Sequence, residues 1–330
     1  MKYTILQNLL LATRKLYQRC FERSQKKIPI KRISDPNEVS LLLMERINTG
    51  KPLMVTRFGA VEISALKNYL GIMNPCHNIW KFITGKRPEW WWNEGTRYCM
   101  LNNAGFFPND DNSLEKFCKL MLNDMKQIDI LASWQKDEIL FLNKFPTARF
   151  INFVFIDPFW SKQPWTKALE NKKVLVVHPF SEEIEYQYKY NRERIHHNPD
   201  ILPSFTLQTI KAVQSIGGNS EFASWFEALD YMKSEIDKCD YEICLLGCGA
   251  YGMPLAAHIK RKGKIAIHFG GSLQLLFGIK GKRWETNEYG KSSFPDGIGH
   301  YPELMNEYWI RPYASSKFKK ADQVENGCYW

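Results

Sequence analysis

The sequence predicts an α/β fold: a Rossmann-like, largely parallel sheet with helices on both faces. Short apolar runs of strand length alternate along the chain with amphipathic helical patterns. Polar residues follow several of these runs directly, at the place where a parallel sheet presents the carboxyl ends of its strands. A glycine turn with the spacing G-x-G-x-x-G joins the apolar run 243–246 to a helical segment. Together these three observations predict a ligand site along one edge of the sheet.

The predicted strands are short apolar runs that loop residues bound on both sides. In chain order we expect strands at 52–56, 128–134, 149–156, 173–177, 243–246 and 264–269. Residues 205–216 are compatible with either a short strand or the start of a helix. Because helical patterns separate most of the strands, we expect them to pair in parallel.

Apolar residues recur at helical spacing between the strands. We expect helices at 37–48, 63–70, 113–127, 182–197, 222–238 and 254–259, and a short one at 303–306. Residues 71–112 are rich in aromatic side chains, and glycine and proline break them into loops. These aromatic residues either form core and subunit contacts or stack on a sugar or a base; both interpretations stay open.

The chain divides into three predicted units: a helix and linker (1–36), an α/β catalytic domain (37–285) and an irregular aromatic wrap (286–330). The pattern of residues 1–27 predicts one basic amphipathic helix. Either this helix packs on the body of the protein or on a second subunit, or it lies on the acidic inner face of a membrane. Residues 28–36 read as a linker. The sequence also leaves open whether the protein forms a homo-oligomer.

Composition narrows the class of protein. An apolar share of 44% in 330 residues suffices for a buried core. Eight cysteines without a C-x-x-C pair favour reduced thiols over zinc or disulfides, so we expect a cytoplasmic protein without a secretion signal. The net charge of +10 suits an anionic ligand or surface, whereas the lack of a nucleic-acid motif argues against nucleic acid.

Polar side chains follow the first strand. Arg57 can fork onto a phosphate or a carboxylate, and Glu62 can act as a base or a ligand. A structural ion pair between Arg57 and Glu62 is the alternative. Further along the chain, Asp157 and His178 also follow strands, which makes both candidate catalytic groups.

The glycine turn contains Gly247, Gly249 and Gly252, and it predicts a phosphate site at a helix N-terminus. The alternative is that these glycines only let the helix and strand pack closely. The strand that follows ends in His268 without a carboxylate, which counts against NAD and against a methyl donor held by its ribose. Three cations then follow, either as a phosphate clamp or as a solvated loop: Lys280, Lys282 and Arg283.

Two of these segments resemble a known family. R-F-G-A-V-E at 57–62 resembles the R-F-G-D-G-E segment of the GT-D-fold glycosyltransferases, first described as a domain of unknown function in bacterial glycosylation clusters. Residues 246–271 are similar to that family's C-terminal glycine turn, helix and A-I-D-I-G-H strand. The resemblance covers about residues 40–285 and implies a GT-D-like fold.

The resemblance also implies chemistry. Family members transfer a sugar from a nucleotide sugar, and their D-x-E carboxylates are linked to a metal that bridges the diphosphate. Glu62 takes the place of the second carboxylate, whereas Ala60 stands at the first. His268 and Gly271 replace the family's Asp and His. Metal use is therefore an open question, with Glu62 as the one implied ligand.

We therefore expect a bacterial glycosyltransferase that uses a UDP-linked donor and builds a surface polysaccharide, such as a capsule, or a glycoprotein. The catalytic candidates are Glu62, Asp157 and His178. The candidates for donor binding are Arg57, Gly59, Gly247, Gly249, Tyr251, Gly252, His268, Gly270, Gly271, Lys282 and Arg283. The alternatives are an oxidoreductase or methyltransferase on a Rossmann-like sheet, and a non-catalytic protein that binds glycans or membranes.

Overall fold

The protein is built around one seven-stranded parallel sheet, with strand order β3-β2-β1-β7-β6-β4-β5. The computed structural model describes residues 4–21, 30–218, 221–289, 294, 298–317 and 327–329. The strands are β1 (Leu53–Thr56), β2 (Ile130–Ser133), β3 (Arg149–Asn152), β4 (Lys173–His178), β5 (Thr206–Lys211), β6 (Ile243–Leu246) and β7 (Ile265–His268). The predicted parallel α/β architecture is confirmed.

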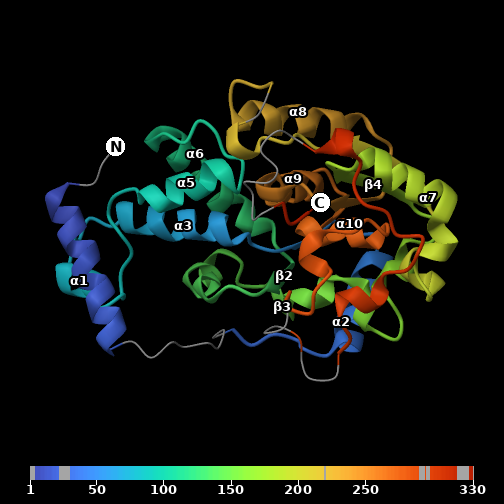
Figure 1. Ribbon diagram of the computed structural model, residues 1–330, viewed down its shortest axis with the longest axis horizontal. Coiled ribbons are helices and arrows are strands. Elements are labelled where there is room, and N and C mark those ends of the chain that lie inside the picture. The colour runs from blue at the N-terminus through green and yellow to red at the C-terminus, as the bar shows by residue number, and fades with distance from the viewer. Residues whose placement is uncertain are drawn as a thin grey trace.

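Helices cover both faces of the sheet (Figure 1). The α-helices of the described residues are α1 (Ile5–Phe21), α2 (Pro36–Asn48), α3 (Ala60–Ile72), α4 (Ile79–Ile83), α5 (Glu94–Asn102), α6 (Asp111–Asp124), α7 (Ser181–Ile195), α8 (Trp225–Lys238), α9 (Gly252–Arg261) and α10 (Leu273–Leu276). Of these, α1 and α4 pack on each other beside the sheet. No helix in the described ranges is long and apolar enough to cross a membrane.

Alternating side chains of each strand divide the core into two layers. In β1, Met54 packs with α3, α6, α8 and α9, whereas Leu53 and Val55 point to the opposite face and pack with α2, α7 and α10. All three side chains are buried. Because both faces of the sheet are covered, the inner strands β1, β2, β6 and β7 are buried along their whole length, as expected of a parallel sheet. The edge strands β3 and β5 carry polar and partly exposed side chains.

The connections after neighbouring strands leave towards opposite faces. β1 leads into α3 and β6 into α9 on one face, whereas β7 leads into α10 and β4 into α7 on the other. These strands are neighbours in the order β1, β7, β6 and β4. The connections that follow any two neighbours therefore diverge and leave a crevice between them. Such crevices at the carboxyl edge are where open α/β sheets bind ligands.

Several predicted boundaries were wrong. α3 begins at Ala60 rather than at residue 63, and β3 ends at Asn152, where a 3₁₀ helix (Phe153–Ile156) replaces the rest of the predicted strand. The segment 71–112 contains two short helices, α4 and α5, which the loop interpretation missed. Asn78 and Asn93 cap them by accepting hydrogen bonds from backbone N–H groups.

The two ends of the chain extend the sheet domain. In the linker, Ile33 pairs with β3 by donating to the carbonyl of Phe150 and accepting from the N–H of Asn152. The described part of the C-terminal wrap buries Tyr301 and Trp309 against the α10 face. α1 follows the predicted N-terminal helix from Ile5 to Phe21; residues 22–27 of that prediction lie outside the described residues.

Candidate functional site

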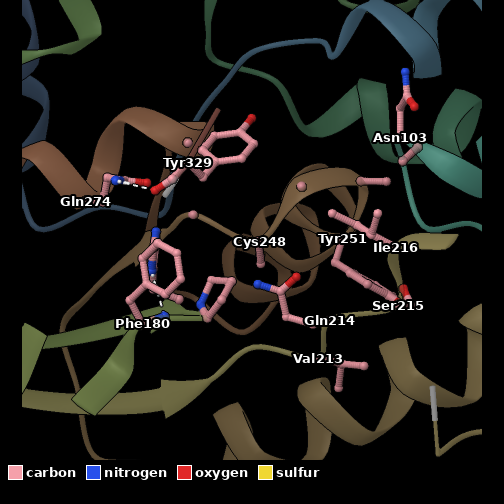
Figure 2. A pocket seen from close by; sticks show the side chains of 17 residues that line it. Asn103, Phe180, Val213, Gln214, Ser215, Ile216, Cys248, Tyr251, Gln274 and Tyr329 are labelled. Carbon is pink, nitrogen blue, oxygen red and sulfur yellow. Dashed lines mark hydrogen bonds between the residues drawn. The ribbon is translucent and has the colours of Figure 1, made fainter. Parts of the chain in front are cut away.

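The carboxyl ends of β1, β7 and β6 open into a cleft of about 620 Å³. The polar and aromatic side chains that line it are Arg57, Glu62, Asn103, Trp134, Phe153, His268, Arg283, Tyr289 and Tyr329. A smaller hollow of about 110 Å³ adjoins it at the ends of β6 and β4 and shares Gly249 and Tyr329 with it (Figure 2). The two hollows together form the candidate site.

Arg57 follows β1 directly and lies between two aromatic rings. Its guanidinium carbon is 5.1 Å from the ring centroid of Trp134 and 5.4 Å from that of Phe153, which follow β2 and β3. The Trp134 ring is itself held by a 2.7 Å hydrogen bond from Nε1 to the carbonyl of Phe58. Gly270, with φ of +76°, approaches the Arg57 side chain from β7.

No carboxylate of the described residues forms an ion pair with the Arg57 guanidinium. The salt bridge to Glu62 that the sequence left open as an alternative is absent from the structure. Arg57 is a half-buried cation whose planar N–H donors have no hydrogen-bond partner in the described chain. A guanidinium held flat against aromatic faces keeps its edge available, and that edge suits a phosphate or carboxylate.

Glu62 lies buried in the first turn of α3 and lines the cleft. Its carboxylate folds back over Gly59, where any side chain would collide with it. Burial raises the pKa of Glu62, while its own backbone N–H and the charge of Arg57 oppose the rise. Gly59 therefore belongs to the site through packing, because its missing Cβ makes room for the carboxylate.

The glycine turn accommodates two histidine rings. A Cβ at Gly247 would collide with the ring of His178, and a Cβ at Gly252 would collide with the ring of His268. Gly249 differs, because its φ is +55° and no atom lies near the position of a Cβ. The close-packing interpretation therefore accounts for the outer two glycines, whereas the middle one is needed for its left-handed backbone.

Both histidines are buried and neutral. The Nδ1 atom of His178 accepts a 3.0 Å hydrogen bond from the N–H of Phe180, so the neutral ring carries its proton on Nε2. His268 pairs its Nδ1 with the Thr56 hydroxyl at 3.0 Å. Burial lowers the pKa of each ring to about 3, and the charge of Arg57 adds to the effect on His268. His178 is thus placed as a hydrogen-bond donor in the smaller hollow rather than as a strong base.

Asp157 lies outside the lining of both hollows. Its two carboxylate oxygens accept hydrogen bonds from the Ser272 hydroxyl and the Tyr301 hydroxyl, each at 2.6 Å. Burial raises its pKa to about 6 against the effect of both hydrogen bonds. The carboxylate therefore links the turn after β7 to the C-terminal wrap.

Only one cation of the predicted clamp lines the cleft. Arg283 donates to the Tyr329 hydroxyl at 3.3 Å and to the Cys328 sulfur at 2.8 Å, and its guanidinium carbon stacks 4.5 Å from the Tyr329 ring centroid. Lys282 is exposed, and neither it nor Lys280 lines a hollow. Gly271 lies against the Tyr329 ring, where a Cβ would collide.

Several lining residues gave no signal in the sequence. Asn103 lies just past α5, and Tyr329 arrives from the last described residues of the chain. Trp134 and Phe153 had one usable signal, because each follows a strand in the same way as Arg57. Tyr251, which the sequence predicts to bind donor, lines the smaller hollow; its hydroxyl pairs with the Ser215 hydroxyl at 2.6 Å and its ring stacks on Trp225.

The cleft residues do not fit a metal centre. Within the described ranges, no group of three or more His, Cys, Asp or Glu side chains is arranged to hold an ion. Glu62 is the one carboxylate in the cleft lining, and Ala60 beside it offers no ligand. One carboxylate is a poor site for a hard divalent cation, which takes several oxygen ligands.

The contact between Gly252 and His268 can be tested by a double-mutant cycle. We expect Gly252→Ala to destabilise the protein by about 1–3 kcal/mol through overpacking. His268→Ala should relieve much of that cost, because it removes the ring that the new Cβ meets, so urea unfolding should show strong non-additivity. Gly249→Ala is the matched control and should be additive with His268→Ala. Additivity in both pairs would contradict the packing described.

Asp157 predicts a specific pH dependence of stability. Its pKa rises from 3.8 to about 6 on folding, so the folded state binds the proton more tightly in that interval. Stability should fall as the pH rises through it, by about 3 kcal/mol from this group. Asp157→Asn should lack that fall in urea unfolding measured between about pH 4 and pH 7. Asp110→Asn, at an exposed helix cap, should keep the fall, because the lowered pKa of Asp110 makes its own contribution grow rather than shrink as the pH rises. An Asp157→Asn profile that equals the wild-type profile would refute the assignment.

Comparison with known proteins returned structural neighbours alone: no protein-family model and no curated protein matches. A selenomethionine-substituted structure of domain of unknown function 1792 is 13% identical, with a TM-score of 0.38, over 84% of this chain and 98% of its own. A second structure, described as showing that this highly conserved domain has a distinct glycosyltransferase fold, is 14% identical, with a TM-score of 0.35, over 92% and 99%. The GT-D-fold glycosyltransferases, which segments 57–62 and 246–271 resemble, were likewise first described as a domain of unknown function. The likeness is too distant to assign any chemistry.

Proposed function

We propose that this protein is a glycosyltransferase that moves a sugar from a nucleotide-sugar donor, UDP-linked, to a glycan acceptor. The observation that carries the proposal is that Arg57 and Glu62 line the same cleft: a cation with no carboxylate partner among the described residues, together with a buried carboxyl group. The acceptor class that we propose is a bacterial surface polysaccharide, such as a capsule, or a glycoprotein. The resemblance of residues 57–62 to the GT-D segment supports the same activity.

Arg57 supplies the charge that a departing nucleoside diphosphate needs. A guanidinium forms two parallel hydrogen bonds to phosphate oxygens, and both strengthen as negative charge develops on the leaving group. The rings of Trp134 and Phe153 hold the guanidinium in place, so little freedom is lost when the donor binds. Arg283 adds a second positive charge to the cleft lining.

Glu62 is the favoured general base for the acceptor hydroxyl in an inverting transfer. It lies in the cleft lining, and burial raises its pKa towards the range where a carboxylate removes a proton most effectively. Asp157 is less suited, since both of its oxygens already accept hydrogen bonds away from the cleft. His178 is a poor base, because burial lowers its pKa to about 3.

The smaller hollow suits the nucleoside. Phe180, Gln214 and Tyr329 line it, and Figure 2 shows Gln214 between the strand ends and the glycine turn. Aromatic faces and an amide are the groups that stack on a planar base and bond to its edge. With the base there, the diphosphate would extend past Gly249 into the larger cleft towards Arg57.

Nucleotide binding is the first test. We expect UDP, among UDP, GDP, CMP, NAD and S-adenosylmethionine, to raise the melting temperature of the full chain. Arg57→Lys should weaken that binding roughly tenfold to a hundredfold, because lysine keeps the charge and loses the two-pronged geometry. Arg149→Lys, at the opposite edge of the sheet, should bind as the wild type does. Stabilisation by NAD or S-adenosylmethionine alone would instead favour an oxidoreductase or a methyltransferase, and no shift with any nucleotide would favour a non-catalytic binding protein.

Glu62→Gln tests the base. Release of nucleoside diphosphate from a panel of nucleotide sugars should fall roughly 10²–10⁴-fold, while nucleotide binding measured by calorimetry stays unchanged. Asp157→Asn serves as the comparison and should retain most of the turnover. Wild-type turnover in Glu62→Gln would remove the base assignment without touching the proposed donor.

A further inference from the structure

The outward face of α1 is apolar. Ile5, Leu9 and Leu16 are 90%, 62% and 63% exposed, and the exposed Ala12 lies between them. Their spacing of four, three and four residues places all four side chains on one side of the helix. A surface helix of a soluble domain normally turns such a stripe towards the core.

The opposite face of α1 is already anchored to the body. Leu10 is buried, and Arg14 forms a 3.3 Å ion pair with Glu89 while stacking over the ring of Phe82. The ring of Tyr17 lies 6.1 Å from that of Trp80 in α4. Packing on the body, one of the two interpretations left open by the sequence, describes this face, and the apolar stripe is left without a partner in the described chain.

Apolar side chains beside the anchored face of α1 are exposed as well. In α4, Trp80 is 66% exposed beside Tyr17, and its neighbour Ile79 is also exposed. Phe21 is exposed at the end of α1. We call the outward stripe the α1 patch; it consists of Ile5, Leu9, Ala12 and Leu16. It lies at one end of the molecule (Figure 1).

Positively charged residues lie beside the α1 patch, and the described segments that form and adjoin it contain no acidic residue. Neither residues 4–21 nor residues 63–88 contain an aspartate or a glutamate. Lys15 and Arg19 of α1 and Lys81 of α4 are exposed. An apolar stripe with a cationic border is the composition of helices that lie in the headgroup region of acidic membranes.

From this combination we infer that the α1 patch is a docking surface for an anionic lipid bilayer, with α1 lying parallel to the membrane plane. α1 does not combine the length and the apolar character that crossing a bilayer requires, and the face opposite the patch packs on α4. Ile5, Leu9 and Leu16 enter the acyl boundary, while Lys15 and Arg19 contact lipid phosphates. A second copy of the chain fits less well, because a two-fold contact would bring the same cations together.

Flotation of the full chain with lipid vesicles tests the docking surface. The wild type should float with vesicles of phosphatidylcholine and phosphatidylglycerol, and roughly tenfold less with phosphatidylcholine alone. Leu9→Ser/Leu16→Ser should lower binding to the anionic vesicles by about tenfold or more, since it removes two inserted side chains. Lys15→Gln/Arg19→Gln should lower it by a similar factor and flatten its dependence on salt.

Leu41→Ser/Leu140→Ser is the matched control, since both leucines are exposed on elements away from α1. It should float as the wild type does, and every variant should keep the wild-type melting temperature and nucleotide response. Equal flotation of the wild type and Leu9→Ser/Leu16→Ser would overturn the proposal. So would a dimer in light scattering that Leu9→Ser/Leu16→Ser dissociates while the vesicles bind neither protein.

Discussion

The candidate site depends on one topological constraint: β1, β7, β6 and β4 are neighbours, yet the chain after each leaves towards alternating faces of the sheet. The strands of a parallel sheet pair their backbone N–H and C=O groups with one another. The loops at the carboxyl ends can therefore diverge without leaving strand groups unpaired. Side chains at the carboxyl ends of these strands therefore face a shared crevice, although they lie far apart in sequence. Thr56 and His268, which hydrogen-bond at 3.0 Å, are separated by 212 positions.

Desolvation changes the pKa of the titratable groups in the site. Glu62, His178 and His268 are all buried, and burial raises the pKa of the carboxyl group and lowers the pKa of both rings. Because the folded pKa of each histidine lies near 3, below the ordinary value of 6.5, the unfolded state takes up protons first as the pH falls. Both rings thus favour the folded state at neutral pH and lose that contribution towards pH 3. Among the described residues, the site combines neutral hydrogen-bond donors, the carboxyl group of Glu62 and the guanidinium of Arg57, which is a suitable set for an anionic leaving group.

Much of the fold was predictable, because strands and long helices follow from the local period of apolar residues. The errors occur where tertiary contacts override that period. Residues 153–156 continue the apolar run of β3, but they leave the sheet as a 3₁₀ helix and pack into the core beneath α2. In the segment 71–112, α4 is only five residues long, so its capping asparagine was a better signal than its periodicity.

The sequence by itself determined which residues end the strands, where the glycine turn lies and which face of the N-terminal helix is apolar, since these properties depend on neighbours a few positions away. Only the tertiary structure decided what those residues meet. It placed aromatic rings rather than a carboxylate around Arg57, hydroxyl groups on both oxygens of Asp157, and Tyr329 in the cleft. It also turned the apolar stripe of α1 outward, because Arg14 and Tyr17 hold the other face on the body. These contacts join segments distant in the chain, and no local pattern specifies them.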